Sequence, residues 1–199
     1  MNVKVVTYYT IGNGYEKEVE NFKKSASRLE IETYCEAIPK GTFKSWYEAV
    51  SYKPTFILKC LDGFKECDGV LWVDADAVFR MYPKMSIFDG YHLSFHKFKR
   101  GPIHDVEALT GTMFVANSPY TKEFVSDWIR LTKNWSHTET PEQHGLVEAM
   151  GCSGKDLNVL DLPCEFVWIT DDFRQVYGER QPVIEHMQAS RRLKGARRS

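Results

Sequence analysis

One short stretch, residues 69–73, constrains the fold more than any other part of the chain, because every side chain after its glycine is apolar (GVLWV). Such a strand is buried on both faces, which is typical of a parallel sheet covered by helices. An earlier β-branched and aromatic run, residues 2–9, is separated from it by segments with helical spacing. Strands that alternate with helices form largely parallel sheets. We therefore predict an α/β fold with a mixed, mainly parallel central sheet flanked by helices.

The same patterns predict the remaining elements. Helices are expected after the turn at residues 12–14, on both sides of Pro54, from Ser118-Pro119, and from Thr140, where Thr-Pro-Glu-Gln has the form of a capping box. Further strands are expected at residues 30–37, 91–97, 111–117, 157–161 and 164–169. No internal repeat or linker divides the chain, so we expect one domain over residues 1–190.

Composition excludes several classes of protein. An apolar content of 43% with 14% aromatic residues supports a sizeable core and excludes a disordered chain. No run approaches the roughly 20 apolar residues of a membrane span, and the N-terminus has no leader pattern, so we expect a cytoplasmic protein. The five cysteines are odd in number and form no C-x-x-C pair, which predicts neither a disulfide framework nor a structural zinc site.

Charge is distributed unevenly along the chain. The total is near neutral, with 26 Lys and Arg against 27 Asp and Glu, a net charge of −1. Residues 191–199 nevertheless contain several cations and no acidic residue. We treat this segment as a basic C-terminal tail on an otherwise acidic domain.

Two carboxylates, Asp74 and Asp76, directly follow the buried strand. Side chains two residues apart on an extended chain face the same side, and the carboxyl ends of strands in open α/β sheets are where ligands bind. Two convergent carboxylates repel each other unless a cation lies between them, and hard oxygen ligands suit Mg²⁺ or Mn²⁺. The alternative is a solvated turn, and the buried strand in front of the motif favours the metal site.

The segment that contains these carboxylates, residues 71–76, resembles the metal-binding D-x-D segment of GT-A-type glycosyltransferases. The resemblance continues in the family's order across most of the chain, through residues 6–10, 52–57, 111–114, 141–143, His186 and Lys194. It implies a single Rossmann-like GT-A domain that moves a sugar from a nucleotide sugar, most often a UDP-sugar, to an acceptor with the help of Mn²⁺ or Mg²⁺.

The same resemblance implies roles for individual residues. Implied metal ligands are Asp74, Asp76 and His186; implied donor-binding residues are Tyr8, Thr10, Lys53, Asp74, Gly111, Thr112 and Lys194; implied catalytic residues are Glu142 and Gln143. The pattern is closer to retaining members, whereas inversion would require a base, for which Glu142 is the candidate. The residues after His186 depart from the family's Gly-rich, Lys-Pro-Trp-like stretch.

Structural roles remain open for several of these residues. Tyr8 would otherwise belong to the core, Lys53 would be an exposed lysine, Gln143 a helix cap and His186 a structural histidine.

Two other classes of protein fit parts of the sequence. Residues 74–78 also resemble the nucleophile motif of haloacid-dehalogenase-like phosphohydrolases, with Asp74 attacking phosphorus. In that family's pattern, residues 170–172 would be the second acidic pair, and Ser118 and Lys155 the polar motifs. Against this, that nucleophile normally follows the first strand of the fold. A non-catalytic module that binds sugar or nucleic acid is the third class.

The sequence is compatible with three classes of acceptor: a saccharide, a small molecule and a modified base in DNA. GT-A-like enzymes that glycosylate hydroxymethylated bases in viral DNA are one resemblance, which would imply a virus-encoded protein acting in the host cytoplasm. Cations in the tail would then neutralise backbone phosphates. The alternative, which we favour, is a solvated terminus in which Lys194 holds the donor diphosphate.

Overall fold

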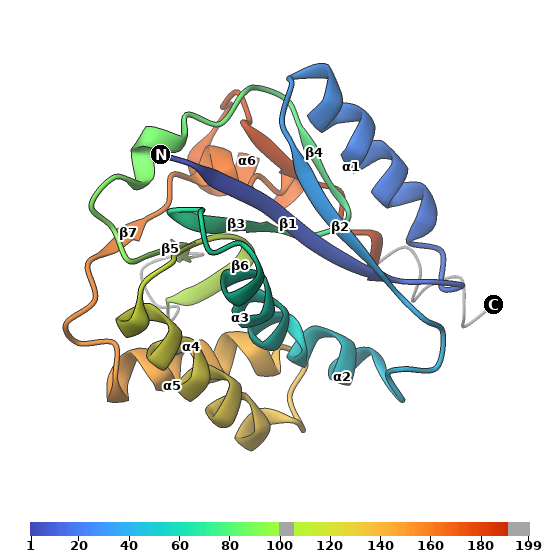
Figure 1. The fold of residues 1–199 in the computed structure, drawn as a ribbon. Helices are drawn as coiled ribbons and strands as arrows, with labels where there is room; N and C mark the ends of the chain where they lie inside the picture. The colour runs from blue at the N-terminus through green and yellow to red at the C-terminus, as the bar shows by residue number, and fades with distance from the viewer. Residues whose placement is uncertain (100–105, 191–199) are drawn as a thin grey trace.

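The structure, a computed structural model, describes residues 1–99 and 106–190 (Figure 1). Its helices are α1 (Glu16–Arg28), α2 (Trp46–Ser51), α3 (Lys53–Gly63), α4 (Pro119–Thr132), α5 (Pro141–Cys152) and α6 (Thr170–Tyr177). Its strands are β1 (Val3–Thr10), β2 (Thr33–Ile38), β3 (Gly69–Val73), β4 (Ala77–Phe79), β5 (Leu93–Phe98), β6 (Glu107–Ala116), β7 (Val159–Asp161) and β8 (Ile184–His186). Short 3₁₀ turns occupy Met85–Phe88, Lys133–Trp135 and Cys164–Phe166.

The central sheet has the strand order β2-β1-β3-β6-β5-β7. β1 pairs in parallel with β2 and β3, and β7 pairs in parallel with β5. β6 is antiparallel to both of its neighbours, so it alone runs against the direction of the other strands of this sheet. A separate antiparallel pair, β4 and β8, lies outside the central sheet. The predicted α/β fold with a mixed, mainly parallel sheet is confirmed.

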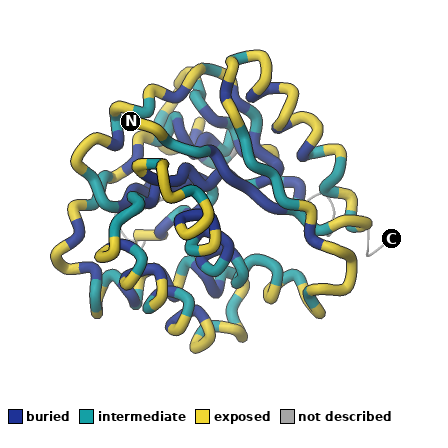
Figure 2. The backbone as a smooth tube through the Cα atoms, in the orientation of Figure 1, coloured by how far each residue is buried: buried dark blue, intermediate teal, exposed yellow. Residues whose placement is uncertain are grey.

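Two apolar layers cover the two faces of the sheet, as the alternation along β3 shows. Val70 and Trp72 pack with residues of α3, α4 and α5, whereas Leu71 and Val73 pack with residues of α1, α6 and the β4-β8 pair. Figure 1 shows these two groups of helices on opposite sides of the sheet, and Figure 2 shows buried chain concentrated in the central strands. Every side chain of β3 is buried, as its sequence predicted.

Three expectations about local structure need correction. Residues 164–169 are not a strand: Cys164–Phe166 form a 3₁₀ turn after Pro163, and Trp168 makes only an isolated bridge to Glu185. The apolar run is explained by burial of Phe166, Val167 and Trp168 in the layer beneath α6.

The second correction concerns the start of α5, where the Thr140 side chain makes no capping hydrogen bond, so the predicted capping box is wrong. The third concerns the second strand, which begins at Thr33 rather than residue 30, because the chain leaves α1 through Glu30 with a positive φ of 55°.

The five cysteines are free thiols, of which Cys60 is buried and Cys152 is exposed. Within residues 1–99 and 106–190, no helix combines the length and apolar character needed to cross a membrane.

Candidate functional site

The carboxyl end of β3 brings together side chains from distant parts of the chain. Asp74 leaves the strand with its backbone N–H donating to the Gly111 carbonyl of β6 at 2.8 Å. Asp76 lies directly before β4, and the pairing of Ala77 with His186 places the end of β8 beside it. The small β4-β8 sheet therefore positions a histidine that is 110 residues beyond Asp76 in the sequence.

Asp74, Asp76 and His186 each offer a ligand atom, and these atoms lie within 4.8 Å of one another. Burial raises the pKa of Asp76, and the nearby negative charge of Asp74 raises it further. Burial also lowers the pKa of His186, outweighing the opposite effect of the two carboxylates. A neutral imidazole and two crowded carboxylates are the donor set that a divalent cation would bind, so these residues fit a metal site.

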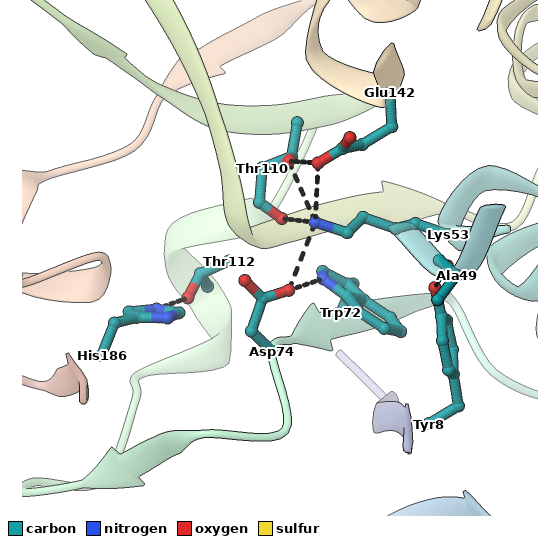
Figure 3. A network of polar contacts seen from close by, with 9 residues as sticks. All are labelled: Tyr8, Ala49, Lys53, Trp72, Asp74, Thr110, Thr112, Glu142 and His186. Atoms are coloured by element: carbon teal, nitrogen blue, oxygen red, sulfur yellow. Dashed lines mark hydrogen bonds and ion pairs between the residues drawn. The ribbon is translucent and has the colours of Figure 1, made fainter. Parts of the chain in front are cut away.

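Each of these three side chains is held by a hydrogen bond that leaves another ligand atom available. His186 Nε2 lies 2.9 Å from the Thr112 hydroxyl, which leaves Nδ1. Asp74 Oδ1 accepts from Trp72 Nε1 at 2.9 Å, and Figure 3 shows its other oxygen on the side of Thr112 and His186. Asp76 Oδ2 accepts from the Ala189 backbone N–H at 2.7 Å. Such outer contacts orient metal ligands in proteins.

Gly111 lies where a side chain would collide with this cluster. A Cβ at this position would be 2.9 Å from His186 Cε1, 3.1 Å from His186 Nδ1 and 3.3 Å from Asp74 Oδ2. The absence of a side chain on β6 therefore makes room for two of the three candidate ligands.

Lys53, the first residue of α3, is the centre of a buried polar network (Figure 3). Its Nζ donates to the Thr110 carbonyl and hydroxyl at 3.1 and 3.0 Å and lies 3.2 Å from Asp74 Oδ1. It also lies 3.5 Å from Glu142 Oε1. Burial would lower the pKa of Lys53, but the charges of Asp74 and Glu142 outweigh burial and raise it. Lys53 is thus a charged, buried group and not the exposed lysine of the alternative interpretation.

Glu142, in the first turn of α5, is also buried. Its Oε1 accepts from the Thr110 hydroxyl at 3.2 Å, whereas no partner for Oε2 is found in the described part of the chain. Burial raises the pKa of Glu142 and outweighs the opposing charge of Lys53. A buried carboxylate oxygen without a partner is costly unless a proton or a ligand satisfies it.

A cleft runs along these groups. One cavity of about 230 Å³, called the main cavity because most of the predicted site residues line it, is bounded by Tyr8, Thr10, Lys53, Asp74, Asp76, Gly111, Glu142 and Gln143. A cavity of about 150 Å³ adjoins it on the side of His186, and one of about 360 Å³ adjoins it on the side of the β1–α1 turn.

Two predicted donor-binding residues have evident structural roles as well. Tyr8 is only 9% exposed, packs against Tyr52, Phe56 and Trp72, and donates its hydroxyl to the Ala49 carbonyl. Thr112 is fully buried and orients His186. Lys194 and the rest of the tail lie outside the described residues.

Several cleft residues were missed by sequence reasoning. Trp72 and Thr110 hold Asp74 and Lys53, but a strand tryptophan and a lone threonine carry no signal of such a role. Tyr15 lines the main cavity, and burial together with Asp76 and Asp74 raises its pKa. Tyr15 follows the turn after the first strand, where α/β proteins often contact ligands. The helical spacing of Tyr15 with later apolar residues predicted only that it would lie on the buried face of α1.

Comparison with known proteins defines the class of fold. The sequence matches no protein-family model and no curated protein. The fold is shared with solved structures, one of which is described as a glycosyltransferase involved in the glycosylation of the major capsid of PBCV-1. Its sequence is 13% identical, the match covers 100% of both chains, and the TM-score is 0.73.

Proposed function

We propose that this protein is a metal-dependent glycosyltransferase that uses a nucleotide sugar, most simply a UDP-sugar, as donor. The observation that carries the proposal is the convergence of Asp74, Asp76 and His186 at the carboxyl end of β3. The fold is that of a glycosyltransferase structure, and the site lies where α/β sheets bind ligands. Mn²⁺ or Mg²⁺ held by these residues would neutralise the negative charge that develops on the departing diphosphate.

The chain's own residues have distinct roles in this proposal. Thr10, Tyr15 and Trp46 line the part of the cleft assigned to the nucleoside, and Gly111 lets the donor approach the backbone of β6. The Lys53 ammonium group holds Asp74 in place through the Oδ1 atom of Asp74. Glu142 and Gln143 line the end of the main cavity that this proposal assigns to the sugar.

The stereochemical outcome is proposed to be retention, on the resemblance to retaining enzymes. In that case the leaving diphosphate takes the acceptor's proton, and Glu142 does not need to act as a base. Proton NMR of the first-formed product tests this directly, because an inverted anomeric configuration would assign Glu142 the role of base.

A screen of UDP- and GDP-sugars for release of nucleoside diphosphate in the presence of Mn²⁺ tests the main proposal. Turnover is expected with one class of donor and is expected to be lost in Asp74→Asn and Asp76→Asn. Asp89→Asn, which changes an exposed aspartate that does not line the cleft, serves as the matched control. Full turnover in both site variants would refute the metal assignment.

The phosphohydrolase alternative has less support from the geometry. Ser118, one of its two expected polar motifs, follows β6 at the end opposite to Asp74: the neighbouring Asn117 N–H donates to the Asp68 carbonyl, before β3 begins. Asp74 Oδ1 is also occupied by Trp72 and Lys53. Release of inorganic phosphate from simple esters, lost in Asp74→Asn and without sugar transfer, would revive that alternative.

A further inference from the structure

The cavity of about 150 Å³ beside His186 opens into the main cavity at the candidate metal site, and the two share Asp74, Asp76, Thr110, Gly111, Gln143 and Ser190. The residues that line the smaller cavity alone are Leu109, Val167, Ile169, His186 and Gln188. The nucleoside-side residues Thr10 and Tyr15 do not line the smaller cavity. A donor that extends from the β1–α1 turn to the carboxylates would therefore present its sugar to the smaller cavity.

Neutral groups dominate the lining of this cavity. Its hydrogen-bonding groups other than the candidate metal ligands are two amides and two hydroxyls, from Gln143, Gln188, Thr110 and Ser190. Its apolar wall consists of Leu109, Val167 and Ile169. No lysine or arginine of residues 1–99 and 106–190 lines it. Amides and hydroxyls both donate and accept, which suits sugar hydroxyls, and aliphatic side chains suit the C–H face of a sugar ring.

Gln188 enters this lining from an unusual backbone conformation. Its φ of 49° lies in the left-handed region, which few residues other than glycine adopt. Both of its neighbours are tied to Asp76: the Met187 N–H donates to the Asp76 carbonyl at 3.2 Å, and the Ala189 N–H donates to Asp76 Oδ2 at 2.7 Å. A strained conformation that is over-determined by its surroundings is a feature of functional sites.

Gln188 and Gln143 are both half-buried residues, and no hydrogen bond of either side chain is found in the described part of the chain. Polar groups in such a position are satisfied by water or by a ligand. Gln188 therefore lines the cavity beside the candidate metal ligands, and the hydrogen bonds from Met187 and Ala189 to Asp76 fix its backbone there.

We propose that this cavity is the acceptor subsite, that it takes a neutral saccharide, and that Gln188 determines specificity by hydrogen-bonding an acceptor hydroxyl. This inference rests on the proposed function. In the transfer, the acceptor oxygen bonds to the anomeric carbon as the bond from that carbon to the diphosphate breaks. The electron pair of the broken bond stays on the diphosphate, which also receives the proton of the acceptor hydroxyl.

The test compares two rates for each variant: release of nucleoside diphosphate to water, and sugar transfer to a panel of methyl glycosides. Gln188→Gly removes the amide and relieves the backbone conformation, and Gln188→Asn keeps an amide that is one methylene shorter. We expect the ratio of transfer to hydrolysis to fall about tenfold in Gln188→Gly and less in Gln188→Asn. A loss of folded enzyme would lower both rates and leave this ratio unchanged. Gln181→Gly, at an exposed loop glutamine, is expected to match the wild type.

Phosphorylated sugars and hydroxymethylated duplex DNA complete the panel. Preference for either of these anionic acceptors, failure of every methyl glycoside to accept sugar while hydrolysis proceeds, or an unchanged ratio in Gln188→Gly would overturn the inference and leave the proposed function standing. Absence of nucleoside diphosphate release from every donor would instead overturn the proposed function, and the inference with it.

Discussion

Most polar contacts of the site converge on Lys53, whose ammonium group touches Thr110, Asp74 and Glu142. A buried ion pair contributes little net stability compared with apolar residues, but removal of one partner leaves a buried charge unpaired. We therefore expect Lys53 to position other side chains rather than to add stability: it holds Asp74 Oδ1 and Glu142 Oε1 in place.

The first prediction follows from this burial. Lys53→Met is expected to lower the free energy of unfolding by about 3–5 kcal/mol, because Glu142 loses its countercharge. The double variant Lys53→Met with Glu142→Gln is expected to recover part of that loss, since the second change removes the unpaired charge. Urea denaturation measures both. Equal stability of the single and double variants would show that Glu142 does not depend on Lys53.

A second prediction concerns Gly111. In Gly111→Ala the new methyl group meets His186 and Asp74, so the apparent affinity for Mn²⁺ and the rate of donor turnover are each expected to fall by about tenfold or more. Gly63→Ala, where a Cβ meets nothing within 4 Å, is the control. Wild-type Mn²⁺ dependence in Gly111→Ala would mean that His186 and Asp74 do not act together.

At the scale of elements, the sequence predicts the parts that are locally determined. The buried strand β3 and the carboxylates that follow it are adjacent in sequence, so pattern and position agree. β4 and β8 are three residues each, too short for any periodic pattern, yet their pairing brings His186 to Asp76. His186 was predicted as a metal ligand from the resemblance to a family, because no local pattern in the sequence indicates that role.

Two further features could not be predicted from local sequence pattern. Burial of Lys53 depends on Glu142, 89 residues later in the sequence, facing it across the cleft. The run at residues 164–169 has the composition of a strand, but it packs as an apolar layer without ladder partners, so composition alone misassigned it.

A third prediction concerns packing between β5 and α6. His96 Nδ1 donates to the Leu162 carbonyl at 2.7 Å, and Nε2 accepts from the Tyr177 hydroxyl at 2.8 Å, which fits the neutral ring. Burial lowers the pKa of His96, outweighing the carbonyl of Leu162 and the charges of Asp161 and Glu165. The unfolded chain therefore binds the proton first, and the free energy of unfolding is expected to fall as pH drops through about 6.5.

His96→Gln isolates this contribution, because its amide also donates and accepts. Denaturation at pH 7.5 and 5.5 is expected to show a smaller loss of stability on acidification in His96→Gln than in the wild type. An identical loss in the two proteins would assign the acid sensitivity to other groups.

For the whole molecule, the reversed direction of β6 shapes the site. Because β6 runs antiparallel to β3, its middle residues Thr110, Gly111 and Thr112, and not its end, lie beside Asp74. The side of the cleft proposed for the donor is bounded by β1 and α2, and the other side by β6, β8 and the start of α5. The two sides of the cleft therefore carry different side chains because one of them is formed by the reversed strand β6.

The most direct test of the central claim is Mn²⁺ binding followed by electron paramagnetic resonance of the free ion, with donor turnover recorded in parallel. We expect binding at one site per chain in the wild type and loss of that binding in Asp76→Asn. We also expect this variant to remain folded with an undiminished melting temperature, because removal of a crowded buried charge offsets any weakened hydrogen bond. A chelator is expected to abolish donor turnover in the wild type. Unchanged Mn²⁺ binding in Asp76→Asn, or full turnover in the chelator, would contradict the account.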